Sequence, residues 1–120
     1  MGRTLTTTMG AAAVALAGCG GPVAEERGAA PPATGLTLVP TATGLAVEGS
    51  GGREIGFGRD RAGALQSALR VAGGRANPVD CAEAGRDGAR LGGLVMVFEA
   101  GAFIGWSAGS AAAGARCSAV

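Results

Sequence analysis

The sequence contains no histidine, no lysine and no tyrosine, and it has a single tryptophan. Histidine is the usual general base for a serine nucleophile and a frequent zinc ligand, and lysine is the common substitute base. Their absence argues against a serine hydrolase and against zinc sites that contain histidine. We therefore expect no enzymatic activity, no cofactor and no metal site.

An excess of positive or negative charge is also missing. The chain has ten arginines and nine acidic residues, which gives a net charge of +1. A balance this close to neutral lacks the basic surface that nucleic-acid binding requires. The apolar run near the N-terminus covers residues 9–17, which is too short to span a bilayer. A chain of 120 residues has room for one small domain.

The N-terminus has the parts of an export signal: one charge at Arg3, and then the apolar run. Two processing sites overlap at its end. Ala15-Leu16-Ala17 fits the small-x-small rule of ordinary signal peptidase, which would release a soluble exported protein. Leu16-Ala17-Gly18-Cys19 resembles the lipobox of bacterial lipoproteins. That resemblance implies a signal peptide over residues 1–18 and acylation of Cys19.

The number of cysteines distinguishes these two interpretations. Ordinary cleavage would leave Cys19, Cys81 and Cys117 in an oxidising compartment, with one thiol unpaired. Lipidation uses Cys19 and leaves an even pair. A Cys81–Cys117 disulfide would close a loop of about 36 residues and contribute roughly 3–4 kcal/mol. The alternative is that these two cysteines are free buried thiols.

The residue after Cys19 helps to predict which envelope membrane would hold the lipidated protein. In well-studied bacterial envelopes an Asp at the next position marks retention at the inner membrane, whereas here the residue is Gly20. By this resemblance we expect the periplasmic side of the outer membrane. Residues 19–35 contain three prolines, several glycines and no apolar period, which predicts a disordered, lipidated linker.

Residues 36–107 predict a small α+β domain in which one short helix packs on a small antiparallel sheet. β-type runs at residues 36–39, 45–47 and 54–57 predict short strands. A helix is expected over residues 60–72, with Asp60 as its N-cap and Gly73-Gly74 at its end. The apolar positions that recur at helical spacing are Leu65, Ala68, Leu69 and Ala72.

The second half of this domain is predicted to contain a polar loop and a hairpin. Residues 76–93 show little regular pattern, whereas residues 94–106 form two apolar runs around Ala100-Gly101, a two-residue turn. This register places Phe98 opposite Phe103, Val97 opposite Ile104, and Val95 opposite a buried Trp106. Residues 108–120 are small and featureless and predict a loose C-terminal tail, tied by Cys117.

The domain also resembles small uncharacterised proteobacterial envelope lipoproteins. Their shared pattern is I-x-F-G, a helix, and a hairpin that ends in Gly-Trp. The matching positions are Ile55, Phe57, Gly58, Phe98, Phe103, Gly105 and Trp106. The order is also similar to the helix-then-hairpin repeat of small outer-membrane-assembly lipoproteins and of β-lactamase inhibitor protein, although those repeats have two helices. The resemblance covers about half the chain, and its motifs are structural.

Three motifs suggest chemistry, and each has a structural explanation that we favour. Residues 105–109 match the G-x-S-x-G elbow around Ser107, but no base is present. Gly56-x-Gly58 with Gly63 approximates a dinucleotide fingerprint, but its third glycine is two positions late. The cysteines and nearby carboxylates lack metal-site spacing. The carboxylates concerned are Asp80, Glu83 and Asp87, which we interpret as solvated loop residues.

A cluster of arginines around the predicted helix start is the remaining candidate site. Arg53, Arg59 and Arg61 lie close in sequence to a helix N-terminus, which attracts anions through its free amides. The cluster could hold a phosphate, a lipid headgroup or a cell-wall carboxylate. The alternative is a solvated face in which these arginines pair with Glu54 and Asp60.

The sequence as a whole predicts a lipid-anchored envelope protein with a non-catalytic binding or scaffold module. Its partners would be the membrane, through acylated Cys19, and an envelope protein or cell-wall component. The alternative function is an inhibitor or accessory subunit of an envelope enzyme.

Overall fold

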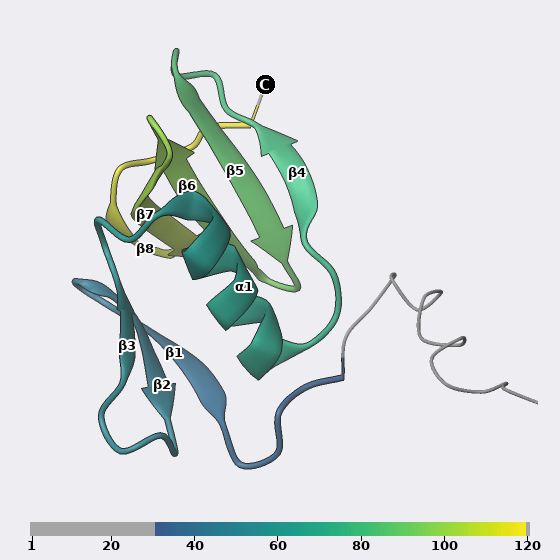
Figure 1. The fold of residues 1–120 in the computed structure, drawn as a ribbon. Coiled ribbons are helices and arrows are strands. Elements are labelled where there is room, and N and C mark those ends of the chain that lie inside the picture. The colour runs from purple at the N-terminus through teal and green to yellow at the C-terminus, as the bar shows by residue number, and fades with distance from the viewer. Residues whose placement is uncertain (1–30, 120) are drawn as a thin grey trace, which may run out of the picture.

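The computed structural model describes residues 31–119, and within them one helix packs with two antiparallel sheets (Figure 1). The expected α+β class with one helix is confirmed, although the domain contains more sheet than the sequence predicted. The expected signal peptide over residues 1–18, the acylated Cys19 and most of the linker over residues 19–35 lie outside the described residues.

The first sheet has three strands, in the order β1-β2-β3. They are β1 (Thr37–Thr41), β2 (Gly44–Glu48) and β3 (Glu54–Gly56), which confirms the three short strands expected here. Leu45 of β2 pairs with Ile55 of β3, and both side chains are buried. This sheet therefore contributes a small apolar face to the core.

Helix α1 (Arg61–Ala72) begins and ends where the sequence predicts. The Gly63 N–H donates to Asp60 Oδ2 at 2.8 Å, which is the expected N-cap. At the other end the Gly73 N–H donates to the Leu69 carbonyl oxygen at 2.8 Å. The cap residues alone therefore define the length of this helix.

The buried face of α1 differs by one position from the predicted apolar stripe. Ala64, Ala68 and Val71 are buried, whereas the expected Ala72 is exposed. The helix contacts β1, β3 and β7 and therefore lies against both sheets. The small side chains of the two buried alanines let the helix backbone lie close to both sheets. The larger side chains of Leu65 and Leu69 pack beside them and are half-buried.

The second sheet is a five-stranded meander in the order β4-β5-β6-β7-β8. Its strands are β4 (Asn77–Asp80), β5 (Arg86–Leu91), β6 (Leu94–Glu99), β7 (Ala102–Ala108) and β8 (Ala111–Gly114). Two predictions are wrong here. The expected polar loop over residues 76–93 forms β4 and β5, and the expected loose tail over residues 108–120 contains β8.

The two outer strands of this sheet are connected to each other through the segments that follow them. Cys81, directly after β4, forms a disulfide with Cys117, beyond β8, and their Cα atoms are 4.8 Å apart. Cys81 also forms a β-bridge with Ala119, and the Ala82 N–H donates to the Ser118 carbonyl oxygen at 2.7 Å. Figure 1 shows the yellow C-terminal segment crossing to the end of β4. The C-terminal segment is thus part of the fold.

The β6–β7 hairpin has the predicted turn but a different register. Ala100 and Gly101 have φ angles of 51° and 80°, as a type I′ turn requires, and Phe98 pairs with Phe103 as expected. A β-bulge then shifts the pairing by one residue. The predicted pairs Val97–Ile104 and Val95–Trp106 are therefore wrong.

The observed pairs beyond the bulge are Val97 with Gly105 and Met96 with Trp106. Ile104 is the extra residue, and its carbonyl oxygen accepts a hydrogen bond from the Ala115 N–H at 2.9 Å. The bulge therefore directs this carbonyl toward the C-terminal segment instead of β6. It also places Trp106 opposite a buried methionine.

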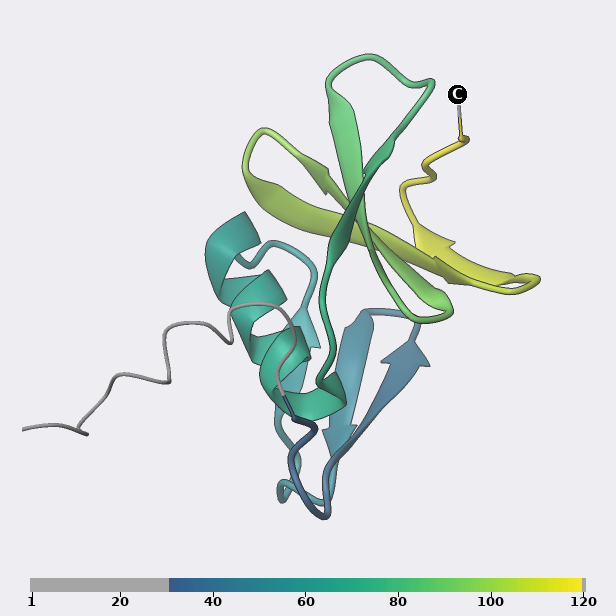
Figure 2. The same cartoon turned by 90° about the vertical axis from the view of Figure 1, so that its right-hand side faces the viewer.

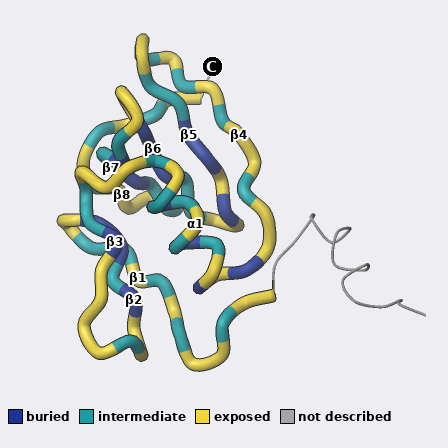
Figure 3. The backbone as a smooth tube through the Cα atoms, viewed as in Figure 1, coloured by how far each residue is buried: buried dark blue, intermediate teal, exposed yellow. Residues whose placement is uncertain are grey.

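The core lies between α1 and the two sheets (Figures 2 and 3). All three phenylalanines meet there, with the ring of Phe103 5.1 Å from that of Phe57 and 5.8 Å from that of Phe98. Trp106 is buried as expected, and its indole N–H donates to the Thr41 carbonyl oxygen at 2.7 Å. This bond joins the second sheet to the end of β1.

Candidate functional site

A groove of about 400 Å³ lies between α1 and the β2–β3 hairpin. Its floor is apolar and its rim carries three arginines, so we name it the arginine groove. The residues that define it are Val47, Ile55 and Val71 in the floor and Arg53, Arg59, Ser67 and Arg70 at the rim. The floor residues belong to the hydrophobic core, so the groove is a depression in a well-packed surface.

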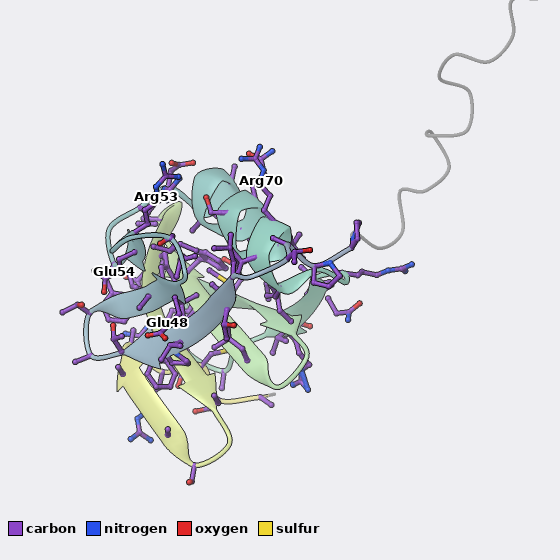
Figure 4. All side chains as sticks on the ribbon, turned by 90° about the horizontal axis from the view of Figure 1, so that it is seen from below. Glu48, Arg53, Glu54 and Arg70 are labelled. Carbon is purple, nitrogen blue, oxygen red and sulfur yellow. A yellow bond between two sulfur atoms is a disulfide. The ribbon has the colours of Figure 1, made fainter. Side chains whose placement is uncertain are left out.

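Each arginine of the groove is placed by a different local structure. Arg53 follows the Gly51-Gly52 turn, and its backbone N–H donates to Ser50 Oγ at 3.0 Å. Arg59 precedes α1 and donates from Nη2 to Ser67 Oγ at 3.1 Å, which lays its side chain against the helix. Arg70 lies in the last turn of α1, where a positive charge is favourable. Figure 4 shows Arg53 and Arg70 at the outer surface, from the β2–β3 side and from the helix.

One acidic residue, Glu54, lines the groove among the described residues. Its Oε2 accepts hydrogen bonds from the hydroxyls of Thr43 at 2.9 Å and Thr41 at 3.2 Å. In the described part of the chain this carboxylate makes no salt bridge with an arginine. The groove therefore carries three positive charges and one negative charge, and the negative charge is already hydrogen-bonded.

Arg61, the third arginine of the cluster expected from the sequence, lies elsewhere. Its Nη2 is 2.7 Å from Asp87 Oδ2, and its guanidinium carbon lies 4.9 Å from the centre of the Phe98 ring. Both partners belong to the second sheet. The structure thus brings Arg53 and Arg59 to one groove and separates Arg61 from them.

The backbone amides at the start of α1 are largely engaged by the protein itself. The Arg61 N–H donates to the Gly101 carbonyl oxygen at 2.8 Å, and the Ala64 N–H donates to that of Asp60 at 2.9 Å. The Gly63 N–H is bonded to the Asp60 carboxylate. The positive character of the groove therefore comes from side chains and not from the helix terminus.

Arg70 is the member of the groove that the sequence analysis did not select. Ser67 and Arg70 are three residues apart and therefore share one face of the helix. That spacing, together with Arg59 just before the helix, is the signal from which the site could have been found. Arg59 and Arg61 are close in sequence, but they lie on either side of the N-cap, and Arg59 bonds Ser67 of α1 whereas Arg61 bonds Asp87 of the second sheet.

Ser107 lies within β7 and pairs with Val95 on one side and Ala112 on the other. A nucleophile elbow requires a sharp turn from a strand into a helix, and this position in the middle of a sheet lacks it. The glycine motif before α1 serves the turn into the helix, since Gly58 has a φ of 100° and Gly63 leaves room for the Asp60 carboxylate.

The carboxylates interpreted as loop solvation lie near or within the second sheet. Asp87 pairs with Arg61, and Asp80 ends β4. Glu83 binds Ser118, accepting from its N–H at 2.9 Å and from its hydroxyl at 2.8 Å. These two hydrogen bonds hold the pKa of Glu83 below its ordinary value of 4.5.

This lowered pKa predicts a pH-dependent attachment of the C-terminal segment. A depressed pKa stabilises the fold fully above the ordinary value of 4.5, and the contribution is lost as the pH falls through the folded-state pKa. Hydrogen exchange at the Ser118 amide should accelerate, relative to amides in β6, as the chain is acidified below 4.5. Glu83→Gln should weaken protection at neutral pH and remove this acid dependence. Equal profiles in the two proteins would contradict the assignment.

Two classes of site are not found among residues 31–119. No group of three or more cysteine, aspartate or glutamate side chains is positioned to hold a metal ion there. No helix in the described residues is long and apolar enough to cross a membrane.

Comparison with known proteins adds no assignment. No protein-family model, no curated protein and no solved structure matches this chain.

Proposed function

We propose that this chain is an exported protein, anchored by an acylated Cys19 to a bacterial envelope membrane, whose domain binds a partner without catalysis. The observation that supports this most directly is the disulfide between Cys81 and Cys117. Disulfides persist in oxidising compartments, which favours export. Because these two cysteines are paired, Cys19 is the one thiol of the chain left for acylation.

The sequence around Cys19 supports the same proposal. Leu16-Ala17-Gly18 before it resembles a lipobox, and Gly20 after it favours the outer membrane. Acyl chains contribute about 0.8 kcal/mol for each buried methylene, so two or more chains give stable attachment. The domain would then stand on the periplasmic side.

A binding role fits the chemistry of the groove. Guanidinium groups stay protonated at all physiological pH values, so they hold anions but do not transfer protons. The three arginines of the groove are exposed and surround an apolar floor. Such an arrangement is suited to recognition of an anionic group.

Intact-mass measurement of the protein extracted from membranes tests the anchor. We expect a chain that begins at Cys19, carries fatty acyl groups and incorporates labelled palmitate. Cys19→Ala should be unlabelled and should be washed from the membrane fraction by high salt, whereas the acylated chain should stay, because acyl chains supply an attachment that salt does not screen. Recovery of the wild-type chain with residues 1–18 attached, or with a free thiol at Cys19, would contradict the proposal.

A further inference from the structure

The eight arginines of the described residues fall into three groups: two in salt bridges, three at the groove, and three elsewhere that make no salt bridge, which are Arg75, Arg90 and Arg116. Arg61 and Arg86 make salt bridges, with Asp87 at 2.7 Å and Glu99 at 2.9 Å. The three arginines of the groove make no salt bridge within residues 31–119, although Arg59 and Arg70 lie on the same side of α1. The groove differs from the other unbridged positions because it gathers three arginines at one depression, where like charges without a counter-charge repel one another. The groove therefore has the electrostatics of a site that an external anion would complete.

The groove also lies where the chain arrives from Cys19. The Ala33 N–H donates to the Val71 carbonyl oxygen at 3.3 Å, and both Val71 and Leu36 line the groove. Figure 2 shows the described chain starting beside the C-terminal end of α1, the end that carries Arg70. Eleven residues separate Cys19 from Pro31. Even fully extended, they span only about 40 Å.

These two features point to the membrane itself as the source of the anion. Guanidinium groups bind phosphate oxygens through paired hydrogen bonds, and the Ser67 hydroxyl adds a further polar group at the rim. A short tether keeps the local concentration of headgroups high. Each arginine near an anionic bilayer favours binding by about fivefold.

We propose that the arginine groove binds the phosphate headgroup of an anionic phospholipid, and so holds the domain against the membrane to which Cys19 is anchored. This inference rests on the proposed lipid anchor. The groove then faces the bilayer.

The test uses residues 19–120 with Cys19→Ala, so that binding by the groove is measured without acyl chains and without the apolar run at residues 9–17. Cosedimentation compares vesicles of phosphatidylcholine with vesicles that also contain phosphatidylglycerol. Arg53→Gln/Arg70→Gln removes two guanidinium groups that make no hydrogen bond in the described structure. We expect this double variant to bind the anionic vesicles about 30-fold more weakly.

A matched control removes the same charge elsewhere. Arg90 and Arg116 are also exposed, and their guanidinium groups make no hydrogen bond among the described residues. Arg90→Gln/Arg116→Gln should bind the anionic vesicles as tightly as the parent, within about twofold. Equal weakening by both double variants would mean that net charge acts alone, and it would overturn the inference.

Two further measurements separate the remaining outcomes. Titration with inorganic phosphate tests a free anion as the ligand, and binding of phosphate without binding to anionic vesicles would overturn the headgroup assignment. Urea unfolding followed by Trp106 fluorescence checks that all variants remain folded. Because every chain lacks the acyl group, failure of this test leaves the mass measurement on Cys19 unaffected. Absence of acylation there would remove the anchor without changing the vesicle result.

Discussion

Cys81→Ala/Cys117→Ala is expected to lower the free energy of unfolding by about 3–4 kcal/mol, because the crosslink closes a long loop. The two cysteines are 36 residues apart, and in the unfolded chain the bond removes much of the freedom of that loop. A domain this small has only a modest core to compensate for the loss. The double variant is therefore expected to be marginally folded.

The position of the disulfide adds to the expected effect. Cys117 lies over β5, where a Cβ atom added to Gly88 would come within 3.3 Å of its Sγ. The bond joins the segments after the two outer strands of the second sheet, and Glu83 and Ser118 form the neighbouring contact. Without the crosslink, the segment after β8 keeps only hydrogen bonds, among them those of Ser118 with Glu83 and Ala82. We expect the C-terminal segment to be the first part of the sheet to open.

Urea unfolding measures this prediction through the fluorescence of Trp106, which is buried and is the single tryptophan in a chain without tyrosine. A reductant should lower the stability of the wild-type domain toward that of the double variant and leave the variant unchanged. If the reduced wild-type protein unfolds at the same urea concentration as the oxidised one, the crosslink does not stabilise the domain.

The sequence predicted the elements whose signals are local. Asp60 and Gly73 mark the ends of α1 through hydrogen bonds within a few residues, and Ala100-Gly101 marks the hairpin turn. Strands β4 and β5, which the sequence did not predict, contain proline, glycine and charged residues, and these residue types are depleted in strands. β5 is extended because it pairs with the apolar β6, and β4 pairs in turn with β5, so both depend on pairing that no local pattern displays.

The C-terminal strand was missed for a related reason. The sequence of β8 is AAAG, which carries no hydrophobic alternation. Its small side chains instead permit close pairing with β7, where Gly105 lies opposite Gly114, and the disulfide at Cys117 holds the segment that follows. The bulged residue Ile104 is bonded to Ala115, directly after β8, so the wrong tail and the wrong register meet at one unrecognised contact.

The sequence predicted two of the three arginines of the groove. Arg53 and Arg59 were selected because they are near the helix start, and they do line one groove. Arg61 was included for the same reason, but the carboxylate of Asp87, 26 positions later, draws its side chain to the other sheet. Arg70 was left out because which face of α1 meets the β2–β3 hairpin is decided by packing between two sheets.

Gly105→Ala is expected to destabilise the domain by about 3 kcal/mol, at the upper end of the cost of overpacking a buried site. Gly105 is buried in β7 and pairs with Gly114 of β8. A Cβ atom there would overlap the carbonyl oxygen of Ala115 and lie 2.6 Å from its backbone nitrogen. Both obstacles are backbone atoms, so no side-chain rotation relieves the clash.

The neighbouring chain has little freedom to move away from the added methyl group. The Ala115 N–H is bonded to the Ile104 carbonyl oxygen at 2.9 Å, and Cys117, two residues later, is held by the disulfide. The methyl group must therefore disrupt the pairing of β7 with β8 and the segment after it, or displace the bulge at Ile104. Loss of the Ala115 amide's protection from hydrogen exchange would report the first, and altered exchange in β6 would report the second.

Gly93→Ala is the matched control, because a Cβ atom at Gly93 meets nothing within 4 Å and its φ lies outside the positive region. This variant should change the free energy of unfolding by less than about 0.5 kcal/mol. The difference between the two variants then measures the contact with Ala115 and not the general effect of replacing a glycine in a strand or turn. Similar stabilities for the two proteins would show that Gly105 and the backbone of Ala115 are not in tight contact. In that case the close packing of β7 against the C-terminal segment would not explain the glycine at this position.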